Sequence, residues 1–399
     1  MTQVVYNLVA VVCAFLLAYA FTPTVRVLAF KIGAVDIPLD GRRVHDKPIP
    51  RIGGLAIYLS FTLTTLFFCE YTSELLTICV GGALLVVVGI LDDVYRLKPG
   101  IKLLVQFVAA IFAVLNGCVI DHITLGGNVL DLGIFSIPLS VLWIVGLTNS
   151  INFIDGLDGL ACGVSAISSL SLLVVVFLHG DLISTLLCGI LFGACIGFLP
   201  FNSNPAKIFM GDTGALFLGY VMSILSIHGV FKLHAVLSFI VPLIIFALPL
   251  FDTLFAIIRR LFSGKSPFAA DRGHIHHRLI DMGFDQKDSV RLLYAISGIL
   301  GLVAVFCSEH MFSSQRVVKS IGIAAIALFL FCINYFIIKN PSSRKHSGIA
   351  HDEMTVSDYM HELDPEKVKK IEEENGITLD EIEKAEQQKA HNNIDDNKS

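Results

Sequence analysis

The chain has 399 residues, of which 54% are hydrophobic and only 16% are charged, and its formal net charge is −5. A mean hydropathy of +0.74 excludes a soluble globular domain and indicates a membrane protein. We expect membrane lipids, and no nucleic acid, among its partners.

Eleven stretches of about twenty residues contain few charges, which is the length a helix needs to cross the hydrocarbon core of a bilayer. They lie at 4–22, 53–69, 75–91, 102–119, 136–152, 160–178, 182–200, 214–230, 235–258, 290–308 and 318–338. The sequence therefore predicts an all-α polytopic membrane protein with about 11 transmembrane helices. No positive charge precedes the first stretch, so we expect a retained span rather than a cleaved signal peptide.

Lys and Arg gather in alternate connections between these stretches. Segment 23–52 holds six of them and segment 259–291 holds seven, whereas 70–74, 120–135 and 179–181 hold none. Because such residues collect in short cytoplasmic loops, we place the N-terminus outside and the C-terminus in the cytoplasm. A basic face also attracts anionic head groups or phosphorylated substrates, although fixing the topology explains many of these cations by itself.

Several local features complete the organisation of the chain. Gly126-Gly127-Asn128 lies between two short apolar runs and predicts a hairpin. A transmembrane domain at 1–340 is followed by a polar cytoplasmic tail at 341–399, in which Asp364-Pro365 and the capping box Thr378-Leu-Asp-Glu381 predict two helices. The nine cysteines lack metal-ligand spacing and are interpreted as small core hydrophobes.

Four polar clusters lie where apolar stretches end on the basic side, and carboxylates beside a bilayer are costly and usually functional. The clusters are Asp92-Asp93, Asn149 to Gly159, Phe209 to Gly214, and Arg272 to Arg278. Because all four reach the same face of the membrane, the sequence predicts one shared active site.

Each cluster has a functional and an ordinary interpretation. Asp92 and Asp93 suit a divalent cation or a general base, and a solvated helix end explains them equally well. Asp212 either caps the following helix or binds Mg²⁺, which takes one or two carboxylates completed by water and phosphate oxygens.

The two remaining clusters favour ligand binding. Two Asp and two Asn within residues 149–159 indicate a ligand site, although ordinary turns use the same residue types. His274, His276 and His277 suggest zinc, but the surrounding arginines and the absence of a nearby Cys favour phosphate recognition.

Taken together, these motifs resemble the polyprenyl-phosphate N-acetylhexosamine-1-phosphate transferases of glycosyltransferase family 4, integral membrane enzymes that start lipid-linked glycan synthesis. The resemblance covers about residues 1–340 and rests on five ordered motifs. They are His45-Asp-Lys47-Pro-Ile-Pro-Arg51-Ile-Gly53-Gly54, Leu91-Asp92-Asp93, Asn152-Phe-Ile-Asp155-Gly-Leu-Asp158-Gly, Phe209-Met-Gly-Asp212-Thr-Gly and Asp271-Arg-Gly-His274-Ile-His276-His277-Arg-Leu. The first and last motifs resemble the branch that uses UDP-N-acetylglucosamine (UDP-GlcNAc).

The resemblance implies that undecaprenyl phosphate attacks the β-phosphorus of UDP-GlcNAc and yields polyprenyl-diphospho-GlcNAc and UMP. It also implies Mg²⁺, with Mn²⁺ as the alternative, a homodimer, and a multi-pass protein of the bacterial cytoplasmic membrane whose active site faces the cytoplasm. One alternative is a phospho-N-acetylmuramoyl-pentapeptide transferase or another UDP-HexNAc-1-phosphate transferase. A second is a transporter, which would place charged residues near the centres of spans rather than at their ends.

The same resemblance assigns roles to individual residues. The catalytic residues are Asp92, Asp93, Asp212 and His274, and the metal ligands are Asp212 and Asp92. The nucleotide pocket matches Asn152, Asp155, Gly156, Leu157, Asp158, Asn202 and Phe209. The loop that closes on the sugar-diphosphate matches Arg272, His274, His276 and His277, and the cations near the phosphates match Lys47, Arg51 and Lys102.

Asp93 is our favoured general base. The attacking phosphate monoester, with a second pKa of about 6, is already largely deprotonated at neutral pH. Neutralising its charge therefore matters more than removing a proton, and we expect Asp212→Ala to lose more activity than Asp93→Asn.

Overall fold

The structure is a computed structural model that describes residues 2–38, 47–125, 128–231, 240–264 and 273–309, with parts of 356–384. The chain forms two compact units, Met1–Ala34 with Arg51–Ser342 and Val35–Pro50 with Ser343–Ser399. The first unit contains the polar clusters except for Lys47 and its neighbours.

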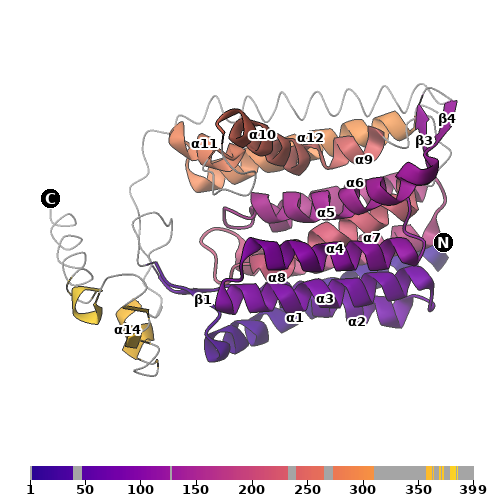
Figure 1. Ribbon diagram of the computed structural model, residues 1–399. Coiled ribbons are helices and arrows are strands. Elements are labelled where there is room, and N and C mark those ends of the chain that lie inside the picture. Colours follow the sequence, from indigo (N-terminus) through magenta and orange to yellow (C-terminus); the bar gives the residue numbers. More distant parts are fainter. Residues whose placement is uncertain are drawn as a thin grey trace, which may run out of the picture. The chain divides into compact units, whose positions relative to one another are not determined.

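Long helices lying side by side build the first unit (Figure 1). They are α1 (Thr2–Ile32), α2 (Gly54–Phe68), α3 (Ser73–Tyr95), α4 (Pro99–Leu115), α5 (Ser136–Ile154), α6 (Leu160–Leu178), α7 (Leu182–Asn202), α8 (Gly211–Ser226), α9 (Ile240–Ile245), α10 (Ala247–Phe262), α11 (Ile275–Asp281) and α12 (Gln286–Glu309). A 3₁₀ turn η1 (Gly133–Phe135) precedes α5, and a π-helical turn η2 (Ile227–Phe231) continues α8.

Seven helical segments of the described chain are long and apolar enough to cross a membrane, and two more, α2 and α4, are shorter apolar helices. The protein is therefore a helical, polytopic membrane protein. Helices lie at ten of the predicted spans, and the eleventh, 318–338, lies outside the described residues.

The predicted span 235–258 is interrupted within its described part. Helix α9 ends at Ile245 and α10 begins at Ala247, with Phe246 between them. Pro249 has no backbone N–H to donate to the carbonyl of Ile245, so the helical hydrogen-bond pattern breaks at this point. Helix α10 is therefore a separate helix that begins at Ala247.

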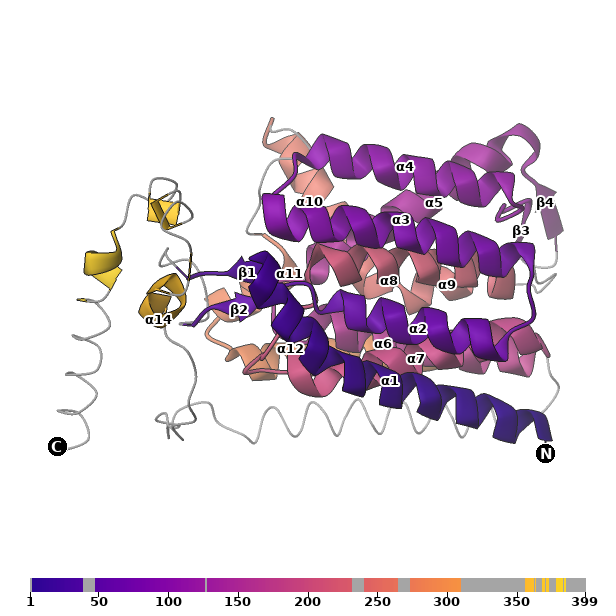
Figure 2. The ribbon, with the colours of Figure 1, turned by 90° about the horizontal axis from the view of Figure 1, so that it is seen from below.

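Helix α8 is the most buried span and packs against α2, α3 and α5 (Figure 2). Glycines allow this close approach, because a Cβ at Gly54 or Gly89 would collide with the backbone of Gly214 or Thr213. The first turn of α8, which contains Asp212, is thereby held against the last turns of α3.

The predicted hairpin is confirmed. Strands β3 (His122–Leu125) and β4 (Asn128–Asp131) pair antiparallel, with Leu125 opposite Asn128. The eight described cysteines are free thiols, in agreement with their interpretation as core residues.

The second unit is described by itself. Strands β1 (Val35–Asp36) and β2 (Ile49–Pro50) form a short antiparallel ribbon, and α14 (Val356–His361) lies in the tail. A small apolar cluster contains Ile37, Met360, Val368, Ile371, Leu379 and Ile382. Thr378 N donates to Glu381 Oε2 at 2.9 Å, as the predicted capping box requires. The predicted helix start at Asp364-Pro365 lies outside the described residues.

Candidate active site

Two carboxylates share one lysine at the end of the bundle where α3 finishes and where α4 and α8 begin. Lys102 Nζ lies 3.1 Å from Asp92 Oδ2 and 2.7 Å from Asp212 Oδ2. Residues 110 positions apart in the chain thus meet in one ion-pair network. A cationic group already lies between these two carboxylates.

Asp93, the neighbour of Asp92, points into the protein and its side chain is fully buried. Its carboxylate accepts hydrogen bonds from Asp212 N at 3.2 Å, Thr213 N at 3.1 Å and Thr213 Oγ1 at 2.7 Å. Arg51 Nε lies 3.7 Å from the same carboxylate. Asp93 therefore caps α8 from another helix and satisfies backbone N–H groups that a helix start leaves without partners.

Gly211 makes this cap possible. Its φ of +70° lies in the left-handed region, and a Cβ there would collide with the carbonyl of Arg51 and the carboxylate of Asp93. The oxygens of Asp93 accept hydrogen bonds from Asp212 and Thr213 and thereby position Asp212. This geometry favours a positioning role for Asp93, and its predicted role as base stays a prediction.

The segment after α5 brings further polar groups to this end of the bundle. Burial, together with the negative charges of Asp212 and Asp93, raises the pKa of Asp155 to about 8, although Arg51 acts in the opposite direction. Gly156 lies against the ring of His276, where no Cβ would fit. This segment therefore contacts the histidine loop, which contains His274, His276 and His277, and the carboxylate cluster contributes to the raised pKa of Asp155.

Asp158 and Asn202 hold the loop before α8. Asp158 Oδ2 accepts from Asn204 Nδ2 at 2.9 Å and from Ala206 N at 3.0 Å, and Asn204 Nδ2 also lies 2.8 Å from Gln286 Oε1. Asn202 Nδ2 donates to the carbonyl of Ile208 at 3.0 Å, while its buried Oδ1 has no hydrogen-bond partner. An unsatisfied buried oxygen of this kind suits a ligand that supplies a donor.

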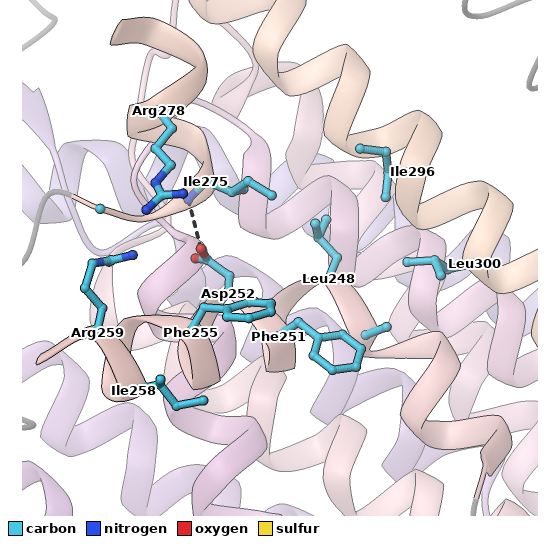
Figure 3. A pocket seen from close by; sticks show the side chains of 12 residues that line it. Leu248, Phe251, Asp252, Phe255, Ile258, Arg259, Ile275, Arg278, Ile296 and Leu300 are labelled. Atoms are coloured by element: carbon cyan, nitrogen blue, oxygen red, sulfur yellow. Dashed lines mark hydrogen bonds between the residues drawn. The ribbon is translucent and has the colours of Figure 1, made fainter. Parts of the chain in front are cut away.

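The histidine loop is anchored by a carboxylate on α10. Asp252 Oδ2 lies 2.8 Å from His274 Nδ1. Asp252 Oδ1 accepts from Ile275 N at 2.8 Å, the dashed line in Figure 3. The rings of His274 and His276 stack with centroids 5.9 Å apart, and Phe153 lies 5.8 Å from His274.

His276 has a different environment from His274. Burial, reinforced by the neighbouring His277, lowers the pKa of His276 to about 4, so its ring is neutral at pH 7. Its Nδ1 is buried without a hydrogen-bond partner. The His277 ring centroid lies 4.3 Å from that of His276.

The predicted residues fall into four groups. One network contains Arg51, Asp92, Asp93, Lys102 and Asp212. Helix ends and connecting segments contain Asn152, Asp155, Gly156, Leu157, Asp158, Asn202, Phe209, His274, His276 and His277. Lys47 belongs to the second unit, so its predicted place near the phosphates stays a prediction. Arg272 lies outside the described residues.

Sequence reasoning missed the contacts made by Thr213, Asn204 and Asp252. A signal existed for Asp252, since a carboxylate inside an apolar stretch is costly and marks a functional position. For Thr213 and Asn204, which are common at helix starts and turns, residue type gave no such signal.

An apolar cavity of about 470 Å³ lies among α10, α11 and α12. Its walls include Leu248, Phe251, Phe255, Ile258, Ile296 and Leu300 (Figure 3). Arg259 and Arg278 line it on the side where Asp252 contacts the histidine loop. The cavity thus combines apolar walls with two cations.

The magnesium ion that the resemblance implies fits the residues present. Asp92 and Asp212 both direct an oxygen at Lys102 Nζ, so the space between them accommodates a positive charge. Among the described residues no group of three or more His, Cys, Asp or Glu has a geometry to hold a metal. Two carboxylates completed by water and phosphate oxygens are what Mg²⁺ takes in phosphoryl-transfer sites.

Comparisons with known proteins show the family of the chain. The glycosyl transferase family 4 profile matches residues 75–230. A probable undecaprenyl-phosphate N-acetylglucosaminyl 1-phosphate transferase of Bacillus subtilis is 44% identical over 300 residues, which cover 74% of this chain and 84% of that protein. A decaprenyl-phosphate N-acetylglucosaminephosphotransferase of Mycolicibacterium smegmatis is 33% identical over 365 residues, 82% of this chain and 88% of that protein.

A more distant relative is the phospho-N-acetylmuramoyl-pentapeptide-transferase of Staphylococcus aureus, 29% identical over 330 residues, 77% of this chain and 99% of that protein. Fold, polar clusters and relatives together define an integral membrane protein of the glycosyltransferase type. The chain belongs to glycosyl transferase family 4.

Proposed function

We propose that this protein transfers N-acetylglucosamine-1-phosphate from UDP-GlcNAc to undecaprenyl phosphate, releasing UMP. The observation that carries the proposal is the meeting of Asp92, Asp93 and Asp212 with Lys102 and Arg51 at one end of a membrane bundle. The Bacillus subtilis relative, at 44% identity, supports the choice of sugar and lipid.

In this reaction an oxygen of the lipid phosphate forms a bond to the β-phosphorus of the donor, and the bond from that phosphorus to the bridging oxygen breaks. Both reacting groups are anions, so catalysis depends mainly on neutralising and positioning charge. A bound Mg²⁺, held by Asp212 and Asp92 with Mn²⁺ as the alternative, would supply Lewis-acid stabilisation of the phosphoryl oxygens. Lys102 and Arg51 supply further positive charge, and Asp93 fixes the position of Asp212.

The cavity beside α10 suits the lipid substrate. Its apolar walls match an isoprenoid chain. The guanidinium groups of Arg259 and Arg278 can each donate two hydrogen bonds to phosphate oxygens. The lipid phosphate would then enter from the side of the histidine loop, whereas the nucleotide would occupy the segment from Asn152 to Asp158.

We further propose eleven spans with the N-terminus outside, a cytoplasmic C-terminus and tail, and an active site that faces the cytoplasm of a bacterial plasma membrane. The distribution of Lys and Arg supports this topology, because the two segments 23–52 and 259–291 hold thirteen of them, whereas 70–74, 120–135 and 179–181 hold none. A homodimer is part of the same proposal.

The test is to mix detergent-solubilised protein with labelled UDP-GlcNAc and undecaprenyl phosphate, with and without Mg²⁺. Label in the organic phase together with UMP, both dependent on Mg²⁺, is the expected result. Absence of product with every UDP-HexNAc donor would refute the proposal and favour a transporter.

A second donor has support from one observation, the 29% identity to the Staphylococcus aureus phospho-N-acetylmuramoyl-pentapeptide-transferase. Competition between UDP-GlcNAc and UDP-MurNAc-pentapeptide separates the two donors. Product from the pentapeptide donor alone would keep the mechanism and change the substrate.

A further inference from the structure

Asp252 is a buried carboxylate whose two oxygens face the histidine loop. It lies in α10 among largely apolar residues, and only 7% of its surface is exposed. One oxygen contacts His274 Nδ1 at 2.8 Å and the other accepts from Ile275 N at 2.8 Å. A carboxylate removed from water is costly unless such partners compensate it, so both contacts stabilise it.

These two bonds fix the ring of His274 in two ways. The bond to Ile275 N holds the backbone at the start of α11, where the side chain of His274 makes no capping hydrogen bond. The bond to Nδ1 places a proton on that nitrogen, which leaves Nε2 for another partner. The orientation and the tautomer of the ring therefore both depend on Asp252.

The adjacent His276 provides an internal comparison. Its ring is nearly parallel to that of His274, with an interplanar angle of 8°, and both histidines are buried. No carboxylate hydrogen bond accompanies the Nδ1 of His276, and burial lowers its pKa to about 4. Two stacked imidazoles thus differ in whether a carboxylate contacts Nδ1.

We propose that Asp252 is a positioning residue that fixes the ring of His274 through Nδ1 and so directs its Nε2 edge at the sugar-nucleotide donor. The inference rests on the proposed function and deepens it. The contacts of this histidine pair with Phe153 and Gly156 place it beside the segment proposed for the nucleotide. Asp252 acts through His274 and contacts no substrate itself.

The experiment is a double-mutant cycle on the full-length protein. Asp252→Asn, Asp252→Glu, His274→Ala and Asp252→Asn/His274→Ala are compared for kcat and for KM of UDP-GlcNAc. Loss of a carboxylate that orients a functional histidine costs about 10- to 100-fold in metal sites, and we expect a similar fall in kcat/KM for Asp252→Asn. Asp252→Glu should retain more kcat/KM than Asp252→Asn does. In the His274→Ala background, Asp252→Asn should lower kcat/KM only slightly further.

Rescue by the conservative variant separates positioning from a purely structural role, because Asp252→Glu keeps a carboxylate for His274 Nδ1 and Asp252→Asn does not. Asp288→Asn, which removes a half-exposed carboxylate 3.1 Å from Arg291, is the matched control and should leave the kinetics unchanged.

Each outcome has one meaning. If Asp252→Asn lowers kcat/KM by the same factor in the His274→Ala background as in the wild type, the inference is wrong. It is also wrong if Asp252→Asn is fully active. If Asp252→Asn fails to fold, the comparison of Asp252→Glu with and without His274→Ala still decides. A wild-type protein inactive with every donor would instead overturn the proposed function.

Discussion

Two segments of the bundle, α3 and α8 with η2, carry charged or reactive side chains at both of their ends. Helix α3 has Glu74 in its first turn and Asp92 in its last turns. Asp212 lies at the start of α8, and His228 lies in η2 beyond its end. At the site end, three carboxylates share two cations, Lys102 and Arg51.

The opposite end is organised differently. His228 Nδ1 lies 2.7 Å from Glu74 Oε1, and His228 Nε2 lies 3.0 Å from Cys118 Sγ, in the residue stretch after α4. These three groups form a hydrogen-bonded chain that joins α3, the end of α4 and η2. The His228 side chain is 7% exposed and that of Glu74 is 31% exposed, so the chain is largely buried.

On the proposed function, the difference separates a reactive end from a structural one. A buried network whose donors and acceptors match is satisfied without any ligand and specifies the packing of its elements. A cluster with more carboxylates than cations is electrostatically incomplete, and the proposed metal ion, together with an anionic substrate, would complete it. Mutations at the two ends should therefore affect different properties.

The largest effect is expected for Asp212→Ala. Removing this carboxylate takes away a proposed metal ligand and a partner of Lys102, and several kcal/mol of transition-state stabilisation corresponds to a loss of about 1,000-fold in kcat. Initial rates of lipid-linked product at saturating Mg²⁺ provide the measurement. Activity within tenfold of the wild type would contradict the proposed metal site.

A smaller loss of activity, with a loss of stability, is expected for Asp93→Asn. The amide cannot accept all the bonds that Thr213 and Asp212 donate, and a buried polar group left without a partner costs about 1–3 kcal/mol. Melting temperature and kcat are measured together against Asp212→Ala. Equal activities at comparable folded levels would refute the ranking, and a loss of activity without any loss of stability would favour the base.

Much of this architecture followed from hydrophobic stretches and charges. The positions of the described spans, the hairpin at 122–131 and the capping box at Thr378 are local properties of the sequence, and the alternation of spans brings Asp92 and Asp212 to the same face. The bridge through Lys102 and the break at Phe246 were not predicted. The bridge depends on the distances between helices, and the break depends on a missing proline donor that hydropathy does not register.

The same reasoning explains why the sequence could not separate the roles of Asp92 and Asp93, so the role of Asp93 as general base stays a prediction. Adjacent residues on a helix point in directions about 100° apart, so Asp92 faces Lys102 whereas Asp93 faces the start of α8. Which of the two faces the substrates depends on where α8 packs. The close glycine contacts that set this packing involve spans distant in the chain.

At the opposite end, His228→Ala should lower stability but leave the reaction intact. It removes the partner of both Glu74 and Cys118, which we expect to cost about 1–3 kcal/mol of unfolding free energy. Thermal melting in detergent and kcat on the folded fraction give the two readings. A large fall in kcat without a change in melting temperature would show that this end takes part in the reaction, and the comparison between the ends would fail.

The last prediction concerns the dependence of stability on pH, which has no effect at neutral pH. Because the folded-state pKa of His276 is about 4 and its ordinary value is 6.5, the unfolded chain binds a proton below pH 6.5 that the folded protein does not. Stability is therefore full above pH 6.5 and falls as the pH decreases towards 4, by about 2 kcal/mol at pH 5. Between pH 7.5 and pH 5, the melting temperature of His276→Gln, which has no titrating ring, should fall less than that of the wild type. An equal loss in both proteins would show that the pKa of His276 is not lowered in the folded state.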